Sequence, residues 1–79
     1  MNDDQVMQVL RRKIVEIVPD VDPAQIRPGA SLADLGCNSL DRMDIVTLTM
    51  ADLGVTGSVE QFRPGQDLAG LAAQLAART

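Results

Sequence analysis

Two nucleophilic side chains lie close together in the middle of the chain, in the stretch LADLGCNSLDRMDIV (residues 32–46). Cys37 carries the only thiol of the protein, and Ser39 carries a hydroxyl two residues later. Either group could attack an acyl or phosphoryl centre if a neighbouring base accepted its proton. The sequence contains no histidine, so the Ser-His and Cys-His pairs that usually provide this base are excluded. One cysteine without histidine also excludes the usual zinc sites, so we expect neither catalysis by this chain nor a bound metal.

Length and composition indicate one small domain spanning residues 1–79. A chain of 79 residues buries only a modest core, which must be aliphatic because Phe62 is the only aromatic residue. The net charge of −4 argues against nucleic acid, whose binding needs a basic surface. No apolar run approaches the ~20 residues of a membrane span, and the acidic N-terminus is unlike the basic start of a secretory signal. We expect a monomer in the cytoplasm that binds neither nucleic acid nor membrane.

An amphipathic helix is predicted over residues 5–18. Asp3 or Asp4 would cap its N-terminus, and Pro19 would end it because proline cannot continue the hydrogen-bond ladder. The basic run at 11–13 should be solvated rather than form a docking patch, since it falls mostly off the apolar face. That face recurs at helical spacing and consists of Val6, Leu10, Ile14 and Ile17.

Residues 19–37 are rich in proline and glycine and are predicted to form a long loop. A structureless loop of this length is unusual in a small domain unless it carries function. One helical turn is expected at 31–35. Spaced apolar residues should hold the loop to the core, namely Val21, Ile26, Leu32 and Leu35.

The second predicted helix begins at Ser39 or Leu40 and ends before Gly54, a typical C-terminal cap. Its core-facing stripe is expected to consist of Met43, Val46, Met50 and Leu53. Three further residues would widen that apolar surface, namely Ile45, Leu48 and Thr49.

Two more helices are predicted in the last third of the chain. Ser58 and Gln61 have capping-box spacing and should open a short helix through Phe62. Asp67 would cap a final helix whose apolar face consists of Leu68, Leu71, Ala72 and Leu75. Since no strand alternation persists, the predicted fold is all-α: a small bundle of three main helices plus one short helix, with a long loop between the first and second helices.

Ser39 has a purely structural explanation. Asn38 and Ser39 are both good N-cap residues, and Asp41 places negative charge in the first helical turn, where the helix dipole favours it. An isolated Asn-Ser pair before a helix would need no further role.

The wider stretch DLGCNSLD, from Asp34 to Asp41, resembles the attachment signature D-L-G-x-[DN]-S-[LI]-[DE] of acyl carrier proteins. The resemblance covers the whole chain, since the helix order, the long loop and the position of the serine recur in register. It implies an acyl-carrier-like bundle in which Ser39 carries 4′-phosphopantetheine, attached from coenzyme A by a phosphopantetheinyl transferase. Acyl groups would ride on the terminal thiol as thioesters. It also implies a non-catalytic protein, which accounts for the absence of histidine.

The residues around Ser39 suit that role. A hydroxyl at the start of a helix is accessible to a modifying enzyme, and a phosphodiester there would meet free backbone N–H groups and the positive end of the helix dipole. Gly36 permits a tight backbone approach just before it. Cys37 could instead carry the acyl group itself, but we expect a small, partly buried packing residue because no histidine is available to generate its thiolate.

The run NSLDRMDIV, followed by TMADLGV, is similar to a narrower group, the discrete donor carriers of polyketide β-branching cassettes. The similarity implies that an acyl-loading acyltransferase supplies a short acyl group, acetyl or propionyl. The carrier would present this group to a hydroxymethylglutaryl-synthase-like (HMG-synthase-like) condensing enzyme. Two alternatives stay open: an acyl carrier of fatty-acid or ordinary polyketide elongation, and an unmodified helical interaction module in which Ser39 is only a cap.

Two further groups of residues follow from the resemblance. The residues expected to be read by partner enzymes are Asp34, Asn38, Leu40, Asp41, Arg42 and Asp44. Their alternative is an ordinary solvated helix face, which contributes little to stability. The residues that could shelter an acyl chain, although core packing is the simpler expectation, are Ile45, Val46, Thr49, Met50 and Phe62.

Overall fold

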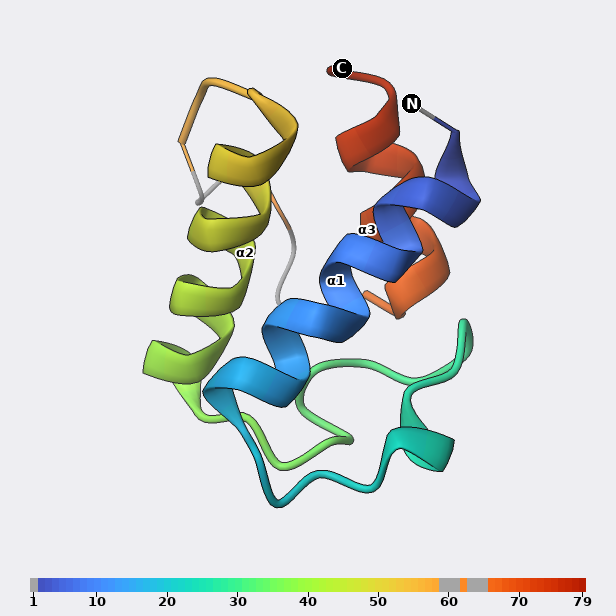
Figure 1. The fold of residues 1–79 in the computed structure, drawn as a ribbon, viewed down its shortest axis with the longest axis vertical. Helices are drawn as coiled ribbons and strands as arrows, with labels where there is room; N and C mark the ends of the chain where they lie inside the picture. The colour runs from blue at the N-terminus through green and yellow to red at the C-terminus, as the bar shows by residue number, and fades with distance from the viewer. Residues whose placement is uncertain (1, 59–61, 63–65) are drawn as a thin grey trace.

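A computed structural model describes residues 2–58, 62 and 66–79 of the chain. These residues form three α-helices and one 3-10 helix: α1 (Asp3–Ile17), η1 (Pro23–Gln25), α2 (Ser39–Leu53) and α3 (Leu68–Ala76). Helix α1 packs against both α2 and α3, and the long connection between α1 and α2 crosses one end of the bundle (Figure 1). The predicted all-α fold is thereby confirmed. Extended pairing within the described ranges is limited to one isolated bridge between Ser31 and Asp67.

Helix α1 starts earlier than predicted because Asn2, and not Asp3 or Asp4, is its N-cap. The Asn2 side chain accepts a hydrogen bond from the Gln5 backbone N–H at 2.8 Å, and the Gln5 side chain accepts one from the Asn2 N–H at 3.1 Å. Asp3 and Asp4 instead lie in the first turn, where their charges favour the helix dipole. The helix ends at Ile17, one residue before the predicted end, with Pro19 shortly after it.

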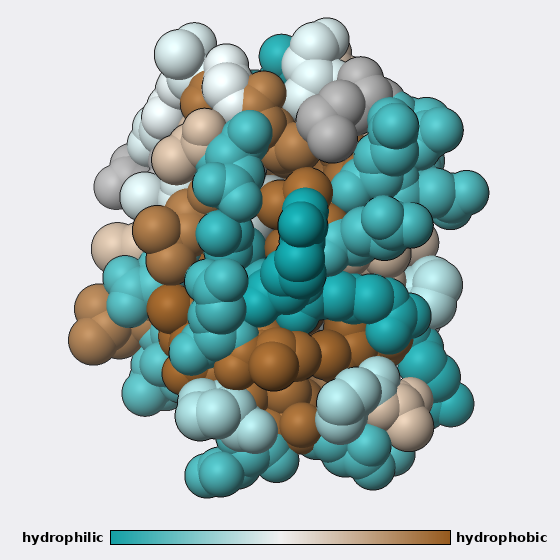
Figure 2. All heavy atoms as spheres, viewed as in Figure 1, coloured by the Kyte–Doolittle hydropathy of each residue, from teal (hydrophilic) through white to brown (hydrophobic). Residues whose placement is uncertain are grey.

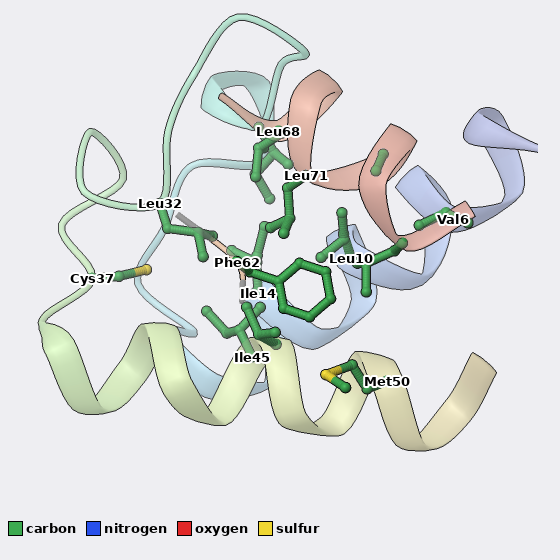
Figure 3. Packing of buried hydrophobic residues seen from close by; sticks show 14 of the residues in the cluster. Val6, Leu10, Ile14, Leu32, Cys37, Ile45, Met50, Phe62, Leu68 and Leu71 are labelled. Carbon is green, nitrogen blue, oxygen red and sulfur yellow. The ribbon is translucent and has the colours of Figure 1, made fainter. Parts of the chain in front are cut away.

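The core is aliphatic, as predicted, and each main helix contributes one face to it (Figure 3). From α1 it includes Val6, Leu10 and Ile14; from α2, Ile45, Val46 and Met50; and from α3, Leu68, Leu71, Ala72 and Leu75. Phe62 is also buried in this cluster. On the face shown in Figure 2, hydrophilic side chains gather over α1, and apolar ones show at the edge formed by α2. Arg11 and Arg12 are exposed, so the expectation of a solvated basic run is confirmed for them.

The connection at 18–38 is less irregular than predicted. It contains η1, which was missed, with Pro23 at its first position and the Asp22 side chain accepting from the Ala24 N–H at 3.0 Å. Ile26 and Leu32 are buried, and Val21 and Leu35 pack against the core, which confirms that apolar residues hold this segment down. The connection also caps α3, because the carbonyls of Ala30 and Pro28 accept from the backbone N–H groups of Leu68 and Ala69 at 2.8 and 3.0 Å.

Helix α2 has the predicted limits, and Gly54 ends it with a left-handed φ of +70°. The predicted core stripe is wrong at Met43, whose side chain is 53% exposed, and Leu48 is 39% exposed. The buried residues of α2 are Ile45, Val46, Thr49 and Met50. At 3.6 residues per turn, Met43 lies roughly 90° around the helix from the centre of this buried face, which explains its exposure.

Two predictions concern the segment after α2. The short helix predicted from Ser58 through Phe62 falls largely outside the described residues. Asp67 caps α3 as predicted, and its Oδ1 accepts from the Gly70 N–H at 2.8 Å. Among the described helices, none combines the length and the apolar character that crossing a membrane requires.

Candidate functional site

Ser39 is the first residue of α2, and Asn38, not Ser39, is the N-cap. Asn38 has an extended backbone, and its Oδ1 accepts from the Asp41 N–H at 2.8 Å. In return the Asp41 carboxylate accepts from the Asn38 N–H at 3.2 Å. Ser39 already belongs to the helix, so its hydroxyl is not needed to satisfy the first N–H groups. The side chain of Ser39 is therefore exposed and unused by the cap.

Arg42 lies one turn along α2 and folds back over this helix start. Its Nη2 donates to the Ser39 Oγ at 3.3 Å, and its Nη1 makes a longer contact, 3.5 Å, to the Cys37 carbonyl. Arg42 is thus half-buried where α2 meets the preceding loop. Asp41 is held in the capping box, whereas Asp44 is exposed. Asp41, Arg42 and Asp44, all expected to be read by partner enzymes, therefore lie in three different environments.

A tight turn shortly precedes the start of α2. The Ser31 N–H donates to the Asp34 carboxylate at 3.1 Å, and the Asp34 N–H donates to the Ser31 Oγ at 3.1 Å. The segment 31–35, expected to form one helical turn, is a hydrogen-bonded turn and not a helix. Asp34 thereby has a structural contact besides its predicted role toward partners. Gly36 then adopts a φ of +85°, which residues with a Cβ rarely adopt.

Cys37 is 5% exposed and belongs to the core cluster, so it is more deeply buried than predicted but is a packing residue as expected. Burial raises the pKa of its thiol; the Asp41 carboxylate raises this pKa further, and the Arg42 guanidinium lowers it. A buried thiol with a raised pKa is a poor nucleophile at neutral pH. This environment argues against the alternative that Cys37 carries the acyl group.

The five residues expected to be able to shelter an acyl chain are all buried in the core: Ile45, Val46, Thr49, Met50 and Phe62. Thr49 is fully buried and donates from its Oγ1 to the Ile45 carbonyl at 2.7 Å, so its polar group is satisfied within α2. Their packing fits the simpler expectation of a core role. Contact with an acyl chain stays a prediction, and it would require the helices to move apart.

The exposed side of α2 carries two large apolar residues beside Ser39. Leu40 is 65% exposed, and Met43, one turn later, is 53% exposed. Leu40 was expected here from the resemblance, but Met43 was missed because its spacing from Val46 placed it in the core stripe. A pattern centred on Ile45 and Thr49 would have placed Met43 on the exposed side of α2, about 140° from that centre.

Ser39 thus lies exposed at the start of a helix, in a small bundle whose sequence lacks histidine. Residues 8–75 match the family described as phosphopantetheine attachment site, and the chain belongs to this family. It is therefore a non-catalytic carrier whose prosthetic group is covalently bound 4′-phosphopantetheine. The expectations of an acyl-carrier relationship and of this cofactor are confirmed.

A curated relative supports the same relationship. A stretch of 55 residues is 33% identical to the polyketide biosynthesis acyl-carrier-protein AcpK of Bacillus subtilis (strain 168), covering 70% of this chain and 67% of that protein. No solved structure matches the chain significantly.

Proposed function

We propose that this chain is an acyl carrier protein of polyketide biosynthesis in which Ser39 bears the phosphopantetheine. The observation that supports this assignment is that two different residues cap the helix and present a hydroxyl at the start of α2. Asn38 caps the helix, and Ser39 is exposed. The similarity to AcpK, whose name places it in polyketide biosynthesis, supports the pathway class.

Attachment at Ser39 needs no base from this chain. The Ser39 Oγ forms a bond to the phosphorus that bears pantetheine in coenzyme A, the pyrophosphate bond breaks, and adenosine 3′,5′-bisphosphate leaves. The phosphopantetheinyl transferase takes the hydroxyl proton. The product is a phosphodiester at the N-terminus of α2, where free backbone N–H groups and the helix dipole favour an anion.

Within this class, we assign the chain to the donors of β-branching. An acyltransferase would load acetyl or propionyl as a thioester, and an HMG-synthase-like enzyme would add that unit to the β-ketone of a chain held on a second carrier. The assignment rests on the resemblance of the run NSLDRMDIV, and exposed Leu40, Met43 and Asp44 beside Ser39 support α2 as the surface offered to that enzyme.

The attachment is tested by intact-mass measurement. The apo protein is incubated with coenzyme A and a promiscuous phosphopantetheinyl transferase, beside the variants Ser39→Ala and Cys37→Ala. We expect wild type and Cys37→Ala to gain one phosphopantetheine and Ser39→Ala to gain none. If wild type gains no mass, the chain is an unmodified interaction module. If Ser39→Ala still gains one phosphopantetheine, another residue is the attachment site.

The donor role is tested with acetylated holo-protein, an HMG-synthase-like enzyme and an acetoacetyl group on a second carrier. Condensation should occur with wild type and fall at least several-fold in Leu40→Ser and Met43→Ser. Val15→Ser is the matched control, because Val15 is an apolar residue that is 42% exposed on a different helix, α1. Equal condensation rates in all three variants would show that α2 is not the recognition surface. Transfer instead to an elongating ketosynthase would favour an ordinary polyketide carrier.

A further inference from the structure

We propose that Arg42 binds the phosphodiester on Ser39 within the same chain and so fixes the root of the phosphopantetheine arm. This inference rests on the proposed attachment at Ser39. It differs from the expectation that Arg42 is read by a partner enzyme, because it gives the guanidinium a ligand inside the carrier itself.

The structure already places the two side chains together. Ser39 and Arg42 are three residues apart on α2, so their side chains lie on the same side of the helix. The guanidinium Nη2 is 3.3 Å from the oxygen that would become esterified, and Nη1 is directed to the Cys37 carbonyl at 3.5 Å. The helix start is held by the Asn38–Asp41 capping box, so the backbone positions of Ser39 and Arg42 do not depend on either of these two contacts.

Esterification changes which oxygen is the better acceptor. The Oγ becomes a bridging ester oxygen, a weak acceptor, while the negative charge resides on the two non-bridging oxygens of the phosphorus bonded to it. A guanidinium stays charged at all ordinary pH values and can present two parallel donors to such oxygens. Both contacts that Arg42 makes in the structure are long and therefore weak. Replacing them by charge-assisted hydrogen bonds to the phosphate costs little interaction energy.

The charges on α2 favour a cation at this position. Arg42 is the only basic residue of α2, whose other charged residues are Asp41, Asp44 and Asp52. A phosphodiester on Ser39 would add a negative charge next to the Asp41 carboxylate, which stays fixed in the capping box. In the described part of the chain the Arg42 guanidinium has no carboxylate within ion-pair distance, so its charge is available to the phosphate.

The test compares apo and holo protein with and without the guanidinium. Wild type, Arg42→Gln and Arg12→Gln are each converted completely to the holo form, as judged by intact mass. Arg12 is the matched control because it is an exposed arginine on α1. Relative to holo wild type, we expect the phosphorus chemical shift to change in holo Arg42→Gln and to stay the same in holo Arg12→Gln. In wild type, the side-chain nitrogen signals of Arg42 should shift on loading.

Stability provides a second readout of the same contact. The change in Tm on loading should be more favourable in wild type than in Arg42→Gln by about 2–4 °C, as for a partly exposed ion pair in a domain of this size. The difference should shrink at high salt, which screens it. Suppose that Ser39 is loaded, that the Arg42 nitrogen signals do not shift, and that the phosphorus signals and Tm changes are equal in wild type and Arg42→Gln. This result would overturn the role of Arg42 and leave the proposed attachment at Ser39 standing. Absence of loading at Ser39 would overturn the proposed function, and this inference with it.

Discussion

The side chains of Asn38 and Asp41 each accept a hydrogen bond from the other residue's backbone N–H, at 2.8 and 3.2 Å, and together they form the start of α2. Asn2 and Gln5 form the same reciprocal arrangement at the start of α1, with distances of 2.8 and 3.1 Å. Two capping boxes of this type therefore occur within the described residues, and one of them adjoins Ser39, the proposed attachment residue.

Asn38→Ala should lower the free energy of unfolding by about 1 kcal/mol, the usual contribution of an Asn cap, and Asn2→Ala should lower it by a similar amount. Only Asn38→Ala should slow phosphopantetheinylation, because it loosens the turn that presents Ser39 and lets the serine hydroxyl serve as a cap. Chemical denaturation and a time course of intact mass measure the two effects. Equal slowing by both variants would show that overall stability, and not the local cap, controls the modification.

Gly36→Ala should destabilise the protein by about 1 kcal/mol, because its φ of +85° is unfavourable for any residue with a Cβ. A Cβ at this position would meet nothing within 4 Å, so the cost comes from the backbone conformation and not from a clash. Gly29 is the control: a Cβ there also meets nothing within 4 Å, and its φ is not in the positive range. Gly29→Ala should change stability by less than about 0.5 kcal/mol. Comparable losses in the two variants, measured by urea unfolding, would contradict the proposed cause.

Asp52→Asn should lower the pKa of Lys13, the only lysine of the chain. The Lys13 Nζ lies 3.0 Å from the Asp52 carboxylate and 3.7 Å from that of Glu16, and the hydrogen bond to Asp52 is the main cause that raises this pKa. Because the folded-state pKa is raised, the resulting stabilisation is complete below the ordinary lysine value of about 10.4 and is lost as the pH rises through the folded value. An NMR titration of the single lysine side chain measures the shift. Glu16→Gln is the control, and a decrease as large as that in Asp52→Asn would contradict the ranking of the two carboxylates.

The holo protein should show two thiols of very different reactivity toward a disulfide reagent such as DTNB. The phosphopantetheine thiol is expected to react quickly at about pH 8, whereas Cys37 should react at least roughly tenfold more slowly, because it is buried and its pKa is raised. Cys37→Ala should remove the slow phase and leave the fast one intact. A fast phase that disappears in Cys37→Ala would reinstate Cys37 as a reactive group.

Much of this fold could be predicted because its signals are local. Pro19, Gly54 and Asp67 act within a few residues of themselves, and they mark the end of α1, the end of α2 and the start of α3. The cap of α1 was misplaced by one to two residues because Asn2, Asp3 and Asp4 are all acceptable caps, and only the backbone conformation selects among them. The helix η1 was missed because a single turn of three residues has no periodicity to detect.

The sequence by itself indicated that a helix begins at Ser39 or Leu40, that no histidine is available to activate the serine, and that the surrounding motif resembles that of phosphopantetheine carriers. Only the tertiary structure decided that Asn38 makes the cap and that Met43 is exposed. It also decided that Arg42 bends back to Ser39 instead of extending into solvent. Motifs and the approximate ends of helices depend on neighbours along the chain, but the backbone conformation of the folded protein selects among adjacent candidate caps. The rotation of α2 against α1, and hence the direction of each of its side chains, depends on packing between residues far apart in sequence.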